Sequence, residues 1–280
     1  MSIESFTEFL EAKRAADERS RDHKTFELFL HYLRQTPKAS VLDAGTGTGA
    51  MARRLVAALP DADCTVTGLD TSCDSIAVAN SVSKDYDRQR LGFACHSLFD
   101  AQSDGIVGTV SAVTAHSFVD EFPPVRLLRT FRQLLGGQGM VYTSLTYNGR
   151  TEFFPQSRDI EYESRMLELY DRSMDERKFD SEPVAGSRGA SRFLAAAEQE
   201  GFGIVSFGAS DWCIQPRSGV YRRGDAVLLA GMVDFVANES LRHEGMDTER
   251  TEAWRAERKA QIRENRLRLL VHHIDSLIEL

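Results

Sequence analysis

A run of alternating glycines in residues 41–55 most constrains what this chain can fold into. An apolar pair opens the run and suits a strand buried on both faces, and Gly45, Gly47 and Gly49 follow it. Glycine has no Cβ, so the backbone there can turn tightly and come close to a ligand. The helix predicted from Gly49 onward points its free N–H groups into the turn, where a polar or anionic ligand is favoured. A turn without a ligand is the alternative, but three glycines would weaken it.

An acidic residue follows the next predicted strand. Residues 64–69 have the pattern of a second strand, and Asp70 stands at its carboxyl end. In a doubly wound α/β sheet, an acid at this place accepts hydrogen bonds from the ribose hydroxyls of a nucleotide-like ligand. Asp70 could instead cap the following helix, a role that Thr71 and Ser72 could also fill.

Two cofactors fit a glycine turn followed by such an acid. The spacing of Gly45, Gly47 and Ala50 fits the loose dinucleotide fingerprint. Asp43, however, stands two residues before the first glycine, and its carboxylate would repel the pyrophosphate of a dinucleotide. S-adenosylmethionine has no phosphate, and a carboxylate attracts its ammonium and sulfonium groups. The residues therefore favour S-adenosylmethionine over NAD(P).

The run Val-Leu-Asp-Ala-Gly-Thr-Gly-Thr-Gly at residues 41–49 resembles motif I of the class I S-adenosylmethionine-dependent methyltransferases. The resemblance covers residues 39–147. It implies an α/β fold with a doubly wound, mostly parallel seven-stranded sheet and an antiparallel last strand. It also implies S-adenosylmethionine as cofactor, held by residues at the strand ends: Asp43, Gly45, Thr46, Gly47, Gly49, Asp70, Thr71, Ser97, Leu98 and His116.

The loop after the third predicted strand, residues 91–95, departs from the family pattern. That loop commonly carries an aspartate that contacts the adenine amino group, followed by an apolar residue that packs on the ring. Here Ser97 stands at the aspartate position, with Leu98 beside it. Asp100 could replace the missing carboxylate only in a loop longer than usual.

The chain divides into four expected regions. These are an N-terminal helical segment or lid (1–38), a cofactor-binding Rossmann-like core (39–149), a helical insertion that caps the substrate (150–190), and the remainder of the core sheet with C-terminal helices (191–280). Residues 3–34 are predicted to be helical. If that segment folds over the cofactor, as it often does in the family, Arg19 or Arg21 could meet a substrate carboxylate.

Helical and strand patterns alternate through the rest of the chain. Further strands are expected at 107–114, 140–146, 202–207 and 267–274, the last one antiparallel beside the sixth; helices are expected at 50–59, through 76–80, through 128–135, and at 193–200, 225–236 and 251–264.

Three residues beyond the carboxyl ends of the fourth and fifth strands are candidates for catalysis. Ligands of open α/β sheets bind outside these ends. His116 and Asp120 follow the fourth strand and could act as general base, and Tyr147 follows the fifth and could orient the acceptor. A structural histidine, and a helix cap at Asp120, are the alternatives.

Composition limits the kinds of partner that this chain is expected to bind. The net charge of −8 argues against a nucleic-acid substrate, and no apolar run is long enough for a membrane span. The four cysteines show no metal-ligand spacing, so reduced thiols and a cytoplasmic location are expected. No metal site is expected at His272 and His273 either, because no further ligands lie at helical spacing from this pair. The oligomeric state is not predictable.

The sequence thus predicts methyl transfer from S-adenosylmethionine to a small-molecule acceptor, with oxygen, nitrogen or carbon as the methylated atom. One alternative is an NAD(P)-dependent oxidoreductase that uses the same turn. Another is a non-catalytic S-adenosylmethionine-binding protein.

Overall fold

The computed structural model describes the backbone of residues 3–280, with the side chains of Phe9 and of residues 12–280. Its main sheet has the strand order β3-β2-β1-β4-β5-β10-β8, and β9 pairs with β10 as an eighth strand. The strands are β1 (Ala39–Ala44), β2 (Cys64–Asp70), β3 (Leu91–Cys95), β4 (Ala112–His116), β5 (Met140–Phe154), β8 (Gly203–Ala209), β9 (Trp212–Ile214) and β10 (Arg268–Glu279). A separate hairpin joins β6 (Lys178–Phe179) and β7 (Glu182–Pro183).

Helices connect and cover these strands. They are α1 (Ile3–Ser20), α2 (His23–Gln35), α3 (Ala50–Ala58), α4 (Cys73–Val82), α5 (Pro124–Leu135), α6 (Ile160–Asp175), α7 (Gly189–Gln199), α8 (Asp225–Ser240) and α9 (Thr248–Arg263), with short 3-10 turns η1 (Val119–Glu121) and η2 (Gly186–Arg188). None of the helices in the described part of the chain is long and apolar enough to cross a membrane.

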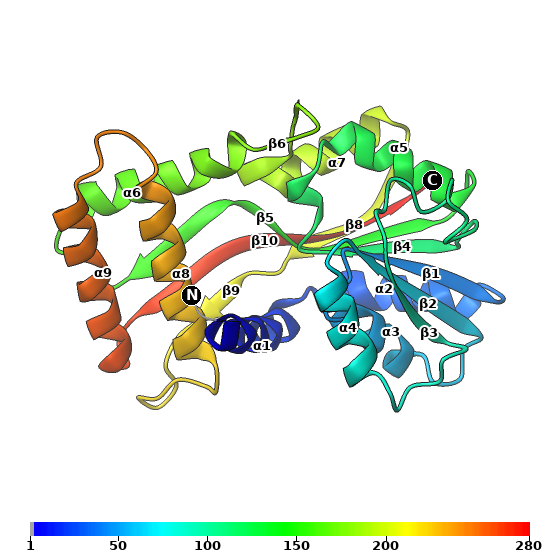
Figure 1. Cartoon of the computed structure of the whole chain (residues 1–280), viewed down its shortest axis with the longest axis horizontal. Helices are drawn as coiled ribbons and strands as arrows, with labels where there is room; N and C mark the ends of the chain where they lie inside the picture. Colours follow the sequence, from blue (N-terminus) through cyan, green and yellow to red (C-terminus); the bar gives the residue numbers. More distant parts are fainter. Residues whose placement is uncertain (1–2) are drawn as a thin grey trace.

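Alternate residues of β1 face two different cores. Val41 belongs to the cluster formed with α2 and α3, whereas Leu42 belongs to the cluster formed with α5 and α7. Successive side chains of a strand point to opposite faces of the sheet, so both faces must be covered. Figure 1 shows α2 and α3 on one side of the strands and α5 and α7 on the other.

A third hydrophobic cluster lies away from β1 to β4. It joins residues of α1, α6, α8 and α9 with the outer parts of β5 and β10. In Figure 1 these helices gather around the end of the long β5–β10 ribbon, at the opposite end of the molecule from β3. We call this part the helical lobe.

The expected fold class is confirmed. Strands β1 to β5 are parallel, and the last strand, β10, is antiparallel to both β5 and β8. β10 therefore lies between the fifth strand and β8, which becomes the outer strand.

Three predicted boundaries were wrong. The single N-terminal helix is two helices, because the Asp22 side chain accepts from the backbone N–H of Thr25 and starts α2. The fourth strand begins at Ala112 rather than at residue 107, since residues 107–111 have no regular secondary structure and do not pair with β1 or β5 in the sheet. The fifth strand runs on to Phe154, because its outer part pairs with β10, so residues 150–154 are strand rather than helical insertion.

The cysteine prediction was also wrong. Cys73 and Cys95 form a disulfide, whereas Cys64 and Cys213 are free. Cys95 ends β3 opposite Asp70 of β2, and Cys73 opens α4 three residues after that aspartate, so the fold brings the two Cα atoms within 5.0 Å. Their spacing in the sequence carries no sign of this contact.

A buried ion pair fixes α6 against α9. Glu163 Oε2 accepts from Nε of Arg258 at 2.8 Å and from Nε1 of Trp254 at 2.6 Å, and the Arg258 side chain is fully buried. Removing one partner of such a pair leaves a buried charge uncompensated. We expect Glu163→Gln to lower the free energy of unfolding by about 3–5 kcal/mol, measured by urea denaturation. Glu161→Gln, an exposed position on the same helix, is the control; equal losses in both variants would contradict the role of the pair.

The disulfide is testable by counting thiols. We expect a thiol reagent to titrate two cysteines in the unfolded, unreduced chain, and all four after reduction. Four reactive thiols before reduction would contradict the Cys73–Cys95 bond.

Candidate cofactor and active site

The glycine turn joins the carboxyl end of β1 to α3. Gly45, Gly47 and Gly49 all have positive φ, so each adopts a backbone conformation that favours glycine. A Cβ at Gly45 would clash with the ring of Phe118, and one at Gly49 with the ring of Phe93. A Cβ at Gly47 would meet nothing within 4 Å. The space in front of the turn is therefore open at Gly47, whereas aromatic side chains of the chain itself occupy the approach at the other two glycines.

Asp70 ties the glycine turn to the end of β2. Its Oδ2 accepts from the backbone N–H of Gly47 and its Oδ1 from that of Ser72, each at 2.8 Å. The helix cap is Ser72, whose hydroxyl accepts from Ser75, so the capping alternative for Asp70 was wrong. Each carboxylate oxygen has a second lone pair for a hydroxyl donor. Thr71, next in the chain, is exposed at the same edge.

Asp43 lies inside the site at the end of β1. The residue is 1% exposed, and its Oδ2 accepts from the hydroxyl of Thr46 at 2.5 Å. Its Oδ1 is buried without a hydrogen-bond partner among the described residues. Burial raises the pKa of Asp43 to about 7, against the lowering effect of the Thr46 hydroxyl. An unpartnered carboxylate oxygen beside an open glycine turn fits a ligand that carries a cation or an N–H donor.

The loop after β3 meets the end of β2. His96 donates its backbone N–H to the carbonyl of Asp70 at 3.0 Å, directly after the disulfide-bonded Cys95. The Ser97 hydroxyl accepts from the N–H of Phe99 at 3.2 Å, and Leu98 is buried in the core on the α5 side. The disulfide thus links the segment after β2, which contains Thr71, to the segment after β3, which contains Ser97. Both segments are expected to contact the nucleoside part of the cofactor.

His116 ends β4, next to β1, and bonds to a side chain of α1. Its Nδ1 lies 2.8 Å from the hydroxyl of Ser144, and its Nε2 lies 3.1 Å from Oδ2 of Asp17. Asp17 also accepts from Nζ of Lys13 at 2.8 Å and from Nε1 of Trp212 at 2.9 Å. Three elements, α1, β4 and β9, therefore meet at one buried carboxylate, and β5 joins the network through the bond between Ser144 and His116.

The charges in this network follow from its contacts. Burial alone would raise the pKa of Asp17, yet Lys13 and His116 hold it well below its usual range, so Asp17 is ionised. Burial lowers the pKa of His116, although Asp17 opposes this shift. The imidazole is therefore neutral at neutral pH. Because ionised Asp17 can only accept, Nε2 of His116 carries the proton, and Nδ1 accepts from Ser144.

Sequence reasoning missed Asp17. It lies in the polar stretch between the two apolar parts of the N-terminal segment, and this stretch has the composition of a solvent-facing helix. The one local signal is Lys13, four residues earlier, which pairs with it.

Neither of the other two catalytic candidates forms a hydrogen bond with His116. Asp120 lies in η1 rather than at a helix cap; its Oδ1 is buried without a partner, and burial raises its pKa to about 6. Tyr147 does not emerge at a strand end, because β5 continues past it. Its hydroxyl donates to Oδ1 of Asp171 in α6 at 2.6 Å. Burial, followed by the nearby Asp171 charge, raises the pKa of Tyr147 far above its usual range.

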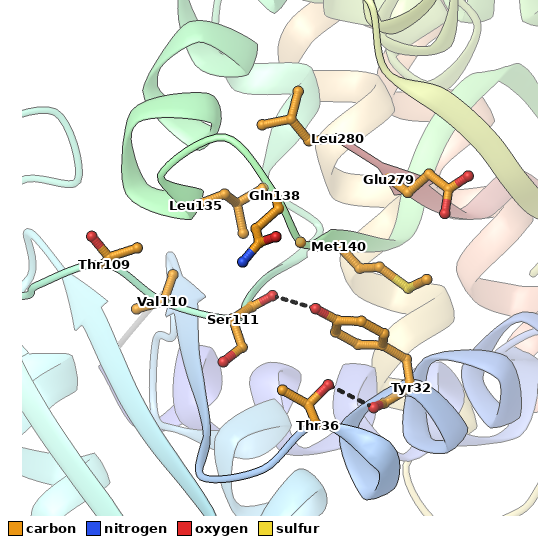
Figure 2. Close-up of a pocket in the computed structure, with 11 residues that line it drawn as sticks. Tyr32, Thr36, Thr109, Val110, Ser111, Leu135, Gln138, Met140, Glu279 and Leu280 are labelled. Carbon is orange, nitrogen blue, oxygen red and sulfur yellow. Dashed lines mark hydrogen bonds between the residues drawn. The ribbon is translucent and has the colours of Figure 1, made fainter.

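A pocket of about 450 Å³ lies near the amino-terminal ends of β4 and β5, at the opposite end of these strands from the candidate site (Figure 2). Its walls include Ser111, which precedes β4, and Met140, the first residue of β5; the hydroxyl of Tyr32 donates to the Ser111 carbonyl at 3.0 Å. Ligands of open α/β sheets bind at the carboxyl ends of the strands, so this pocket is separate from the candidate site. Within residues 3–280, no cluster of three or more His, Cys, Asp or Glu side chains could hold a metal ion.

Part of the chain is similar to known methyltransferases. The model of a family described as a methyltransferase domain matches residues 41–139. A release factor glutamine methyltransferase from Deinococcus radiodurans is 43% identical over 68 residues, which are 24% of this chain and 24% of that protein. The chain thus matches about a quarter of the length of this curated relative.

A solved structure shows the fold. A Bacillus halodurans protein assigned as a methyltransferase superposes with a TM-score of 0.52 at 14% identity, over 90% of this chain and 97% of that one. The matched domain spans the glycine turn, Asp70 and His116. Residues 41–139 thus match a methyltransferase domain, in agreement with the resemblance of the glycine motif, and the superposition shows that the chain shares the fold of that structure.

Proposed function

We propose that this protein transfers a methyl group from S-adenosylmethionine to a small-molecule acceptor, with His116 as general base. The observation that carries the proposal is the position of a neutral, hydrogen-bonded imidazole on β4, the strand that pairs with the glycine-turn strand β1. Residues at the ends of β1, β2 and β3 would hold the cofactor, with Asp70 binding its ribose.

Asp43 and the glycine turn fit the cationic end of this cofactor. The Asp43 oxygen without a partner can accept from the cofactor ammonium, and Gly47 leaves room for close approach. When bound, S-adenosylmethionine supplies a methyl group on a positively charged sulfur, so the protein has to align the acceptor and remove its proton.

His116 is arranged to take that proton. Asp17 holds the ring and fixes the hydrogen on Nε2, which leaves the lone pair on Nδ1. An acceptor hydroxyl or amine would replace the Ser144 hydroxyl as donor to this nitrogen. The imidazolium that forms would be stabilised by ionised Asp17. The His116 side chain is 19% exposed, so an acceptor can reach its edge.

The alternatives have less support. The residues that would bind NAD(P) lie within the part of the chain that matches a methyltransferase domain. A non-catalytic S-adenosylmethionine-binding protein would share the cofactor site, and assays of S-adenosylhomocysteine release against a metabolite panel would separate it from an enzyme.

The absence of nucleic-acid and membrane partners stays a prediction from the charge and the hydropathy of the chain. A cytoplasmic location also stays a prediction, and the cysteine argument no longer supports it, because two of the four cysteines are joined.

We expect Asp70→Asn to weaken binding of S-adenosylhomocysteine about 10- to 100-fold, because charge-assisted hydrogen bonds contribute about 1.5–3 kcal/mol. Isothermal titration calorimetry measures this loss. Asp74→Asn, an exposed position in the first turn of α4, is the control. Equal affinity in Asp70→Asn and the unaltered protein would refute the ribose role.

The pH dependence of methyl transfer tests His116. A base must be unprotonated, and burial lowers the pKa of His116 below its ordinary 6.5. Activity should therefore rise with pH along a limb centred below 6.5 and be level above about pH 7. We expect His116→Asn to lower kcat about 10²- to 10⁴-fold and to abolish this limb, while Asp17→Asn moves it to lower pH.

His31→Asn, an exposed position on α2, is the control for these profiles. A limb that persists in His116→Asn would assign the base to another residue. A loss of S-adenosylhomocysteine binding in this variant would instead make His116 a cofactor contact.

A further inference from the structure

Arg21 is a buried cation with no carboxylate partner among the described residues. The residue is 5% exposed and lies between α1 and α2, and its backbone N–H donates to the carbonyl of Asp17. Its Nε and Nη1 are buried, and neither has a hydrogen-bond partner among the described residues. Arg19 differs, because it pairs with Oδ1 of Asp225 at 2.5 Å. Burying guanidinium N–H groups unsatisfied is costly, and such groups normally pair with a carboxylate or phosphate.

The acidic groups close to Arg21 along the chain are already engaged. Asp17 accepts from Lys13, Trp212 and His116, as described above. Asp22 accepts at Oδ1 from Thr25, and its own backbone N–H donates to Asp275. Glu18 pairs with Arg14 at 3.3 Å. None of the described carboxylates accepts from Nε or Nη1 of Arg21, so these groups are available to a ligand.

A second arginine strengthens the positive charge at this place. The guanidinium carbons of Arg21 and Arg54 each lie 5.1 Å from the centre of the Phe26 ring, and Nε of Arg54 is also buried without a partner. Arg54 belongs to α3, which begins directly after the glycine turn. The charge of Arg21 is one of those that lower the pKa of His116, so Arg21 lies within electrostatic reach of the proposed base.

We propose that Arg21, supported by Arg54, binds a ligand carboxylate at the active site. Arginine presents its N–H groups as a planar fork that matches a carboxylate. The carboxylate can come from the amino-acid end of the cofactor or from the methyl acceptor, and in the second case the acceptor is a small carboxylic acid. This inference takes its location from the proposed function and adds an anion site to it.

Two nucleoside ligands distinguish these sources. S-adenosylhomocysteine carries the amino-acid carboxylate, and 5′-methylthioadenosine is the matching thioether without it. Calorimetry would compare both ligands on the full-length protein and on Arg21→Met, Arg21→Lys and Arg14→Met. Arg14 is an exposed cation on α1, the helix that ends just before Arg21, and serves as the control.

If the cofactor supplies the carboxylate, Arg21→Met weakens S-adenosylhomocysteine binding about 10- to 100-fold and leaves 5′-methylthioadenosine binding unchanged. The affinity of Arg21→Lys for S-adenosylhomocysteine then lies between those of Arg21→Met and the unaltered protein, because lysine keeps the positive charge but lacks the planar pair of N–H donors. If the acceptor supplies it, both nucleosides bind every variant equally. Benzoate then raises the melting temperature of the S-adenosylhomocysteine complex in the unaltered protein but not in Arg21→Met, and uncharged benzamide has no effect on either.

Stability without ligand separates a binding role from a structural one. A cation kept for a ligand costs stability, so Arg21→Met should melt at the same or a higher temperature than the unaltered protein. A lower melting temperature, or ligand and benzoate responses that do not depend on Arg21, would overturn the carboxylate site. Failure of the unaltered protein to bind S-adenosylhomocysteine would instead overturn the proposed function.

Discussion

The carboxylate of Asp17 is the contact on which the site depends. It joins an N-terminal helix to a histidine at the carboxyl end of the central sheet and to a tryptophan of the short strand β9. The polar N–H groups of Lys13, His116 and Trp212 lie in this partly buried region, where each needs a hydrogen-bond acceptor. The two oxygens of the ionised Asp17 carboxylate accept from all three. Without Asp17, the proposed base His116 would lose the neighbour that fixes its tautomer, and α1 would lose these polar contacts with β4 and β9.

Local patterns predicted the parts of the fold that depend on nearest neighbours. Two short strands, β1 and β3, were predicted from their apolar residues. The glycine turn was predicted because its backbone conformation favours glycine. The acid at Asp70 followed from its position after the second strand. The candidate cofactor residues from Asp43 to Asp70 belong to one βαβ unit, so local patterns are enough to predict that they lie together.

The contacts that could not be predicted join distant segments. Asp17 meets His116 and Trp212 only because α1 packs across the ends of β4 and β9, and no local period encodes that packing. Arg19 and Arg21 look alike in sequence, and the fold gives Asp225 to one of them and leaves the other unpaired. The Cys73–Cys95 bond has the same origin, since the register of β2 and β3 decides it.

The β5–β10 ribbon joins the central sheet to the helical lobe. It runs without a break from the sheet into the helical lobe (Figure 1), and Asp275 clamps it by accepting from the hydroxyl of Tyr142 and the backbone N–H of Leu145. α1 belongs to the same lobe, because its buried Phe9, Ala12 and Ala16 lie in the lobe's hydrophobic cluster and Arg19 pairs with Asp225 of α8. Since Asp17 of this helix also bonds to His116 at the end of β4, any displacement of the lobe relative to the sheet would change the surroundings of the proposed base.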